Sequence, residues 1–180
     1  MKPSDTDRPV LYGKLDTPAK RTAFCGVLAA LALIFSYVEA LVPVNAGMPG
    51  IKLGIANLAV LAALYTVGER PAWAVNCCRM ILAAALFGSL YSALYAFSGA
   101  VLAYEAMLIT KRSGLFSPAG VSMAGGSAHN LGQLLCAAAV TRTPGILAYF
   151  PVLLISGLAC GLVNGLLCCL VLPRLEAAIR

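Results

Sequence analysis

The chain has 180 residues, of which 61% are apolar and 11% are charged, and its mean hydropathy is +0.88. Soluble domains carry roughly 25% charged residues, so this composition excludes an ordinary soluble enzyme, a disordered chain and a disulfide-stabilised scaffold. It predicts one compact integral membrane domain. The net charge of +6, from 13 Lys and Arg against 7 Asp and Glu, must therefore be tested against membrane topology before nucleic-acid binding is considered.

Residues 1–22 form a polar segment that contains Lys2, Arg8, Lys14, Lys20 and Arg21. The segment lacks the short apolar core and small-residue cleavage site of a secretory signal. The apolar run that follows is too long for a removable signal. We therefore expect a cytoplasmic tail over 1–22, followed directly by a first membrane span.

Breaks at proline, glycine and charged residues divide the rest of the chain into six apolar segments. A helix needs about 20 residues to cross the hydrocarbon layer, and each segment approaches or exceeds this length. We expect spans at about 23–42, 51–67, 72–88, 91–110, 117–140 and 146–172, with a break at Gly88–Ser89 and the last helix ending at Pro173. The predicted fold class is an all-α bundle of six transmembrane helices over 23–173, followed by a cytoplasmic C-terminal segment, 174–180.

The basic residues predict the orientation of this bundle. Six spans place both termini on one side, together with the loops at 68–71 and 111–114. That side holds ten of the 13 Lys and Arg residues, whereas Lys52, Arg79 and Arg142 lie elsewhere. Cytoplasmic loops carry such an excess, so both termini are predicted to be cytoplasmic. The lipid bilayer then accounts for the positive charge, and no nucleic-acid partner is expected.

Small residues recur at four-residue spacing in several segments. Gly157, Gly161 and Gly165 form one such stripe in the sixth span. Residues four apart share a helix face, and small residues let helix backbones approach closely in lipid. The stripes predict either tight packing within the bundle or contact with a partner protein.

The chain offers little for metal or covalent chemistry. Its seven cysteines lie in apolar runs beside a single histidine, so we expect free thiols, no metal site and no cofactor. It has no phosphate-binding P-loop. Its aspartates, Asp5, Asp7 and Asp16, all lie in the tail. We therefore expect no enzymatic activity.

Ionisable residues inside membrane spans are expensive to bury, so they are usually paired or functional. Arg79 is expected roughly 12 Å, and Glu105 roughly 8 Å, from the inner face of the membrane, by helix rise. They lie on neighbouring antiparallel spans, and we expect them to form an ion pair. Glu39 and the amides of Asn76 and Asn164 are further polar groups within the spans.

Polar residues also gather at middle depth and near the outer mouth of the predicted bundle. They predict either interhelical hydrogen bonds or a solute pocket beneath the loop 43–52, which would be a lid or a plain connection. The candidate substrate-binding residues are Lys52, Asn57, Arg79, His129, Asn130 and Gln133.

Two segments, GMPGIKLGIAN at 47–57 and SMAGGSAHNLGQ at 122–133, resemble the bacterial Gx transporter family. This family is also named heptaprenyl diphosphate synthase component I, and the resemblance covers about residues 22–172. It is similar to the substrate-binding subunits of energy-coupling-factor transporters, which capture a solute and dock on a membrane scaffold driven by two ATPases. The resemblance implies a transport component of the bacterial cytoplasmic membrane. Its docking stripe would lie at Ala23 and Val27, or at Gly26 and Ala30.

The second family name implies a different function. Catalytic prenyl synthases carry aspartate-rich diphosphate motifs, which this sequence lacks. The chain would then be a non-catalytic membrane subunit beside a prenyl diphosphate synthase. A structural partner of a redox or assembly complex is a third interpretation. The expected partners are therefore a small solute with a scaffold and ATPases, or a prenyl diphosphate synthase subunit.

Overall fold

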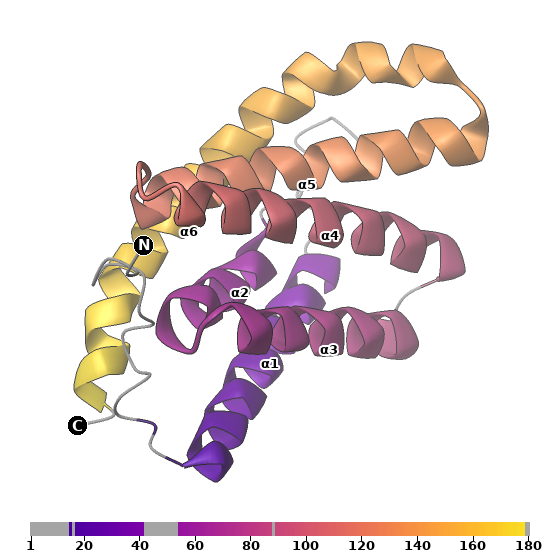
Figure 1. Cartoon of the computed structure of the whole chain (residues 1–180). Helices are drawn as coiled ribbons and strands as arrows, with labels where there is room; N and C mark the ends of the chain where they lie inside the picture. The colour runs from indigo at the N-terminus through magenta and orange to yellow at the C-terminus, as the bar shows by residue number, and fades with distance from the viewer. Residues whose placement is uncertain (1–14, 16, 42–53, 88, 179–180) are drawn as a thin grey trace.

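Figure 1 shows the computed structural model of the chain, which describes residues 15, 17–41, 54–87 and 89–178. Within these ranges no residue lies in a strand. The described helices are α1 (Pro18–Leu41), α2 (Ile55–Thr66), α3 (Glu69–Phe87), α4 (Leu90–Arg112), α5 (Pro118–Thr141), the 3₁₀ helix η2 (Pro144–Tyr149) and α6 (Phe150–Ala178). The predicted all-α fold class is confirmed. The loop 43–52, including Lys52, lies outside the described residues.

Three helical stretches are long and apolar enough to cross a membrane: Pro18–Glu39, Leu90–Arg112 and Pro144–Ala177. Many large apolar side chains on these stretches are exposed, such as Ile34, Phe97 and Ile155. Such surfaces suit a lipid environment, so the described part of the chain has the character of a membrane protein. The count of six spans and the orientation of the termini remain predictions.

The expected end of the last helix at Pro173 is wrong. α6 continues through Pro173 to Ala178. Proline has no N–H for the carbonyl of Cys169, four residues earlier, but the remaining helical bonds can continue around that gap. Pro173 itself removes one hydrogen bond from a helix of 29 residues.

α4, α5 and α6 pack side by side in chain order, with α5 in the middle (Figure 1). At the glycine stripe of α6, the contact with α5 is made largely by backbone. A Cβ atom added at Gly157 would lie 2.8 Å from the carbonyl oxygen of Gly126, and Gly161 and Gly165 approach α5 equally closely. This glycine stripe therefore packs within the bundle, since a larger side chain would separate the two helices.

α2 is the most buried of the helices. Eight of its 12 residues are buried, and it packs against α1, α3 and α6. The surrounding core includes Leu28 of α1, Val75 of α3, Met107 of α4 and Cys168 of α6. Because α2 is short and surrounded by other helices, both of its ends lie close to them.

Candidate functional site

The start of α2 is held by side chains from two other helices. Glu39 of α1 accepts a hydrogen bond from the backbone N–H of Ile55 at 2.5 Å. Asn164 of α6 donates to the carbonyl of Gly54 at 3.1 Å. The first N–H groups of a helix lack intrahelical partners and carry partial positive charge, which a carboxylate satisfies. Gly54 has a φ of 68°, a left-handed conformation that glycine adopts readily.

Arg79 of α3 is related to this helix start through Glu39, whose charge acts on it. Its Nη2 donates to Oδ1 of Asn76 at 2.8 Å, and its Nη1 donates to Oγ of Ser36 at 3.4 Å. Its Nε is buried and has no hydrogen-bond partner among the residues that the structure describes. The carboxylate whose charge acts on this guanidinium is that of Glu39. Asn76 in turn donates to the carbonyl of Ala100 at 3.4 Å, which ties the arrangement to α4.

These groups form one connected polar cluster, whose amides Asn76 and Asn164 are buried and whose other members are half-buried. Glu39 links its two halves, because it bonds to the start of α2 and acts through its charge on Arg79. We call this set the polar cluster; its members are Ser36, Glu39, Gly54, Ile55, Asn76, Arg79 and Asn164.

The structure does not bring Arg79 and Glu105 together. Glu105 is exposed, whereas the neighbouring Tyr104 is buried and faces α3. The ion pair expected from their similar depth is not formed in the described chain. The depth of two residues in the membrane does not say which way their side chains point. One residue step along a helix turns the side chain by about 100° around the helix axis.

His129, Asn130 and Gln133 belong to two different helix interfaces. His129 and Gln133 lie against Gly99 of α4, where an added Cβ would be 3.0 Å from Cε1 of His129 and 2.8 Å from Cγ of Gln133. Asn130 instead faces α6. Its Nδ2 donates to the carbonyl of Leu153 at 2.8 Å and to Oγ of Ser156 at 3.2 Å. For Asn130, these contacts favour the interhelical hydrogen bonding that the sequence left open.

Asn57 lies in the first turn of α2, where its side chain contacts α4 and α5. Its Nδ2 contacts Sδ of Met107 at 3.8 Å and would lie 3.5 Å from a Cβ at Gly125. A thioether is a weak acceptor, so the described residues leave most of the hydrogen-bonding capacity of this amide unused.

Sequence reasoning left Ser36, Glu39, Asn76 and Asn164 out of the candidate site. The three-residue spacing of Asn76 and Arg79 places them on one helix face, which was the available signal. The roles of Glu39 and Asn164 depend on where α2 begins. No spacing within α1 or α6 reveals this position.

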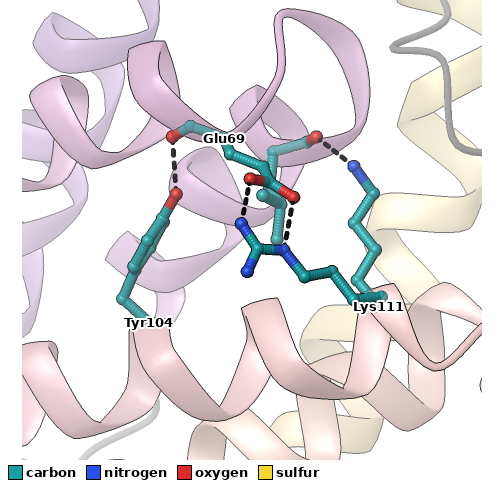
Figure 2. A network of polar contacts seen from close by, with 5 residues as sticks. Glu69, Tyr104 and Lys111 are labelled. Atoms are coloured by element: carbon teal, nitrogen blue, oxygen red, sulfur yellow. Dashed lines mark hydrogen bonds and ion pairs between the residues drawn. The ribbon is translucent and has the colours of Figure 1, made fainter.

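A second polar network joins the turn between α2 and α3 to the end of α4 (Figure 2). Tyr104 donates to the carbonyl of Glu69 at 2.5 Å, and Arg112 donates to both carboxylate oxygens of Glu69, at 2.9 and 2.5 Å. Lys111 donates to the carbonyl of Leu64 at 2.8 Å, near the end of α2. The hydrogen bond from Arg112 lowers the pKa of Glu69, against a smaller opposing effect of burial.

The four residues proposed for docking on a partner lie on the outer surface of α1. Ala23, Gly26, Val27 and Ala30 are all exposed, and no atom lies within 4 Å of a Cβ built on Gly26. Leu28 and Ala29, which lie between them, and Ala32, which follows, face the core instead.

The comparison with protein families identifies one family. The family model named heptaprenyl diphosphate synthase component I matches residues 28–171. No curated protein and no solved structure shows a significant match to the chain. The match spans α1 to α6 and includes both segments that carry the resemblance noted from the sequence. The chain belongs to the heptaprenyl diphosphate synthase component I family, also called the Gx transporter family.

Proposed function

We propose that the chain is a non-catalytic membrane transport component that binds a small solute at the polar cluster. The observation that carries this proposal is a charged guanidinium and a carboxylate gathered at a helix start inside an apolar bundle. Ionisable groups in such surroundings usually mark a binding or transport site. Transporters commonly bind their substrates where helices begin within the membrane.

The proposed topology has six spans, with both termini in the cytoplasm and the network around Glu69 at the cytoplasmic interface. The length of α2 then sets the depth of the site. Twelve residues extend about 18 Å, whereas the hydrocarbon layer is about 30 Å thick. The polar cluster at the start of α2 would therefore lie within the membrane, roughly 12 Å below its outer boundary.

Within the candidate substrate-binding set, Arg79 and Asn57 are the residues best placed for this role. Arg79 belongs to the polar cluster, and the backbone N–H of Asn57 bonds to the carbonyl of Gly54 within it. The Asn57 amide retains unused hydrogen-bonding capacity. We propose that Lys52 adds a second positive charge, and that His129 and Gln133 approach the solute from the α4 side.

We further propose that the exposed stripe on α1 docks on a membrane scaffold served by separate ATPases. The small and exposed residues Ala23, Gly26 and Ala30 would allow close approach of another helix. Solute release would follow from lower affinity in the docked state, with no covalent step.

Solute binding is tested by native mass spectrometry of the full chain in lipid nanodiscs. We expect the wild-type chain to retain a small molecule and Asn57→Ala to lose it. Asn57→Ala is suitable because it removes only a weak contact with Met107. Ser127→Ala is the matched control, because the Ser127 hydroxyl bonds within its own helix. Absence of any retained molecule, or equal retention by both variants, would contradict solute binding.

The family name supports a second candidate function, a non-catalytic subunit beside a heptaprenyl diphosphate synthase. The test is co-purification of the chain with a prenyl diphosphate synthase subunit encoded by the same organism. A stable complex in which the catalytic subunit regains prenyl-chain synthesis would favour this candidate. Co-purification with a scaffold and ATPases would favour transport.

A further inference from the structure

The guanidinium of Arg79 has hydrogen-bonding capacity that the protein does not use. Arginine carries five N–H donors in a fixed plane. Within the described parts of the chain, the contacts made by Arg79 engage one donor on Nη1 and one on Nη2, while Nε is buried without a partner. An unsatisfied buried donor is costly, more so when it is charged. Such a group in a native protein points to a ligand that completes it.

Arg112 of the same chain shows what fills this edge of a guanidinium. Its Nε and Nη2 donate side by side to the two carboxylate oxygens of Glu69, at 2.9 and 2.5 Å. Carboxylates and phosphates both match this planar fork with two parallel hydrogen bonds. At Arg79 the corresponding Nε is unfilled, and Nη2 keeps one of its two N–H groups free of Asn76.

Glu39 balances the charge of Arg79 without filling this edge. Its charge acts on the guanidinium, but Nε has no hydrogen-bond partner, and Oε1 of Glu39 is used by the N–H of Ile55. The positive end of the α2 dipole adds to the charge of Arg79 at the same place. The Nε edge of Arg79 therefore remains open to an acceptor that Glu39 does not supply.

We infer that the solute is an acid whose carboxylate or phosphate oxygens bind to the Nε edge of Arg79. This inference rests on the proposed solute binding and adds the chemical class of the solute. Arg79 is then the residue that selects acids over neutral compounds of the same shape. A site built for such a fork rejects ligands that leave it unpaired.

The test uses the full chain in neutral detergent at constant ionic strength, adjusted with sodium chloride. Thermal unfolding is followed while acetate, in one series, or inorganic phosphate, in another, replaces chloride. Binding to the folded state raises the unfolding midpoint in a saturable way. We expect saturation with one of the two anions, and this identifies carboxylate or phosphate as the group recognised.

Three variants separate the specific site from a general salt effect. Arg79→Gln should raise the half-saturating concentration at least tenfold. Arg79→Lys keeps the charge but lacks the fork, so it should respond between wild type and Arg79→Gln, and it serves if Arg79→Gln folds poorly. Arg70→Gln, at an exposed position on α3, should respond like wild type. Equal responses of all four proteins, or no saturable response in the wild type, would overturn the inference.

The mass-spectrometry experiment distinguishes this failure from failure of the proposed function. A retained neutral molecule that Asn57→Ala loses and Arg79→Gln keeps would leave solute binding intact and overturn the acid assignment. If neither a retained molecule nor an anion response is found, both proposals are wrong.

Discussion

At the level of single residues, the polar groups inside the bundle differ in how fully their hydrogen bonds are used. Asn130 donates to two acceptors on α6, and Asn76 bonds to both Arg79 and Ala100. Arg79 instead keeps a buried donor without a partner. Amides that are satisfied by neighbouring helices stabilise the fold, whereas an unsatisfied charged donor is available to a ligand.

Asn130→Ala should therefore destabilise the chain without abolishing solute binding. The substitution removes two hydrogen bonds between α5 and α6, each contributing about 1 kcal/mol. Reversible unfolding in detergent measures the loss, which we expect to be about 1–2 kcal/mol, with Ser127→Ala as the unaffected control. If Asn130→Ala unfolds like wild type yet loses the retained molecule, Asn130 contacts the solute instead.

A double-mutant cycle tests which carboxylate acts on Arg79. Glu39→Gln removes the charge but keeps an oxygen for the Ile55 N–H, and Arg79→Gln removes the other charge. The changes that these two substitutions cause in the unfolding free energy should be non-additive, because burying each charge costs less free energy when the other is present. Arg79→Gln with Glu105→Gln should add to within about 0.5 kcal/mol. Coupling to Glu105 and none to Glu39 would restore the ion pair expected from the sequence.

At the level of helices, two glycines that both lie within long helices have opposite structural roles. Gly126 of α5 touches the backbone of α6 at Gly157, whereas Gly26 of α1 faces open space. A methyl group added at Gly126 must push α5 and α6 apart. A methyl group added at Gly26 meets no neighbouring atom in the described chain, and alanine has a higher helix propensity than glycine.

Gly126→Ala and Gly26→Ala should therefore change stability in opposite directions. Overpacking at Gly126 should destabilise by about 1–3 kcal/mol, while Gly26→Ala should stabilise by about 0.5–1 kcal/mol. The measurement is the unfolding midpoint and folded yield of both variants. If both variants lost folded protein equally, the placement of Gly126 at a helix interface and of Gly26 on an open helix face would be wrong.

The helical class and the small-residue contact at Gly157 followed from composition and local spacing, whereas the family followed from the resemblance carried by residues 47–57 and 122–133. The partners of Arg79 and Asn130 did not, since spacing relates residues on one helix but does not say which neighbour each face meets. The continuation of α6 through Pro173 was also missed. A proline removes one hydrogen bond, and the packing of a long helix can outweigh this loss.

The ion pair between Glu69 and Arg112 gives the helix ends a predictable response to pH. The folded-state pKa of Glu69 is lowered, so its contribution to stability is present above the ordinary value of 4.5 and is lost as the pH falls through the folded value. At pH about 7 the wild type should have a slightly higher unfolding free energy than Glu69→Gln, and this difference should shrink as the pH is lowered to about 3. The difference is small throughout, because the ion pair is exposed. A difference that is constant with pH would contradict this.

For the whole molecule, the number of spans decides on which side the C-terminal segment lies. Three helical stretches alone satisfy the length and composition of a span in the described chain, and three crossings would place the two termini on opposite sides. Six crossings place them together, with the Glu69 and Arg112 network and most basic residues on the cytoplasmic side. Short or polar helices such as α2 and α5 then cross because their neighbours cover them.

Reporter fusions distinguish the two arrangements directly. With six spans, a fluorescent reporter joined after Arg112 or after Arg180 should be active, because it folds in the cytoplasm. Alkaline phosphatase joined after Arg142 should be active outside, since the turn between α5 and η2 faces away from the cytoplasm. Arg142 itself, exposed at the end of α5, is one of few basic residues expected there. Phosphatase activity after Arg180 would instead require an odd number of crossings when the tail is cytoplasmic. It would also move the polar cluster relative to the two membrane faces.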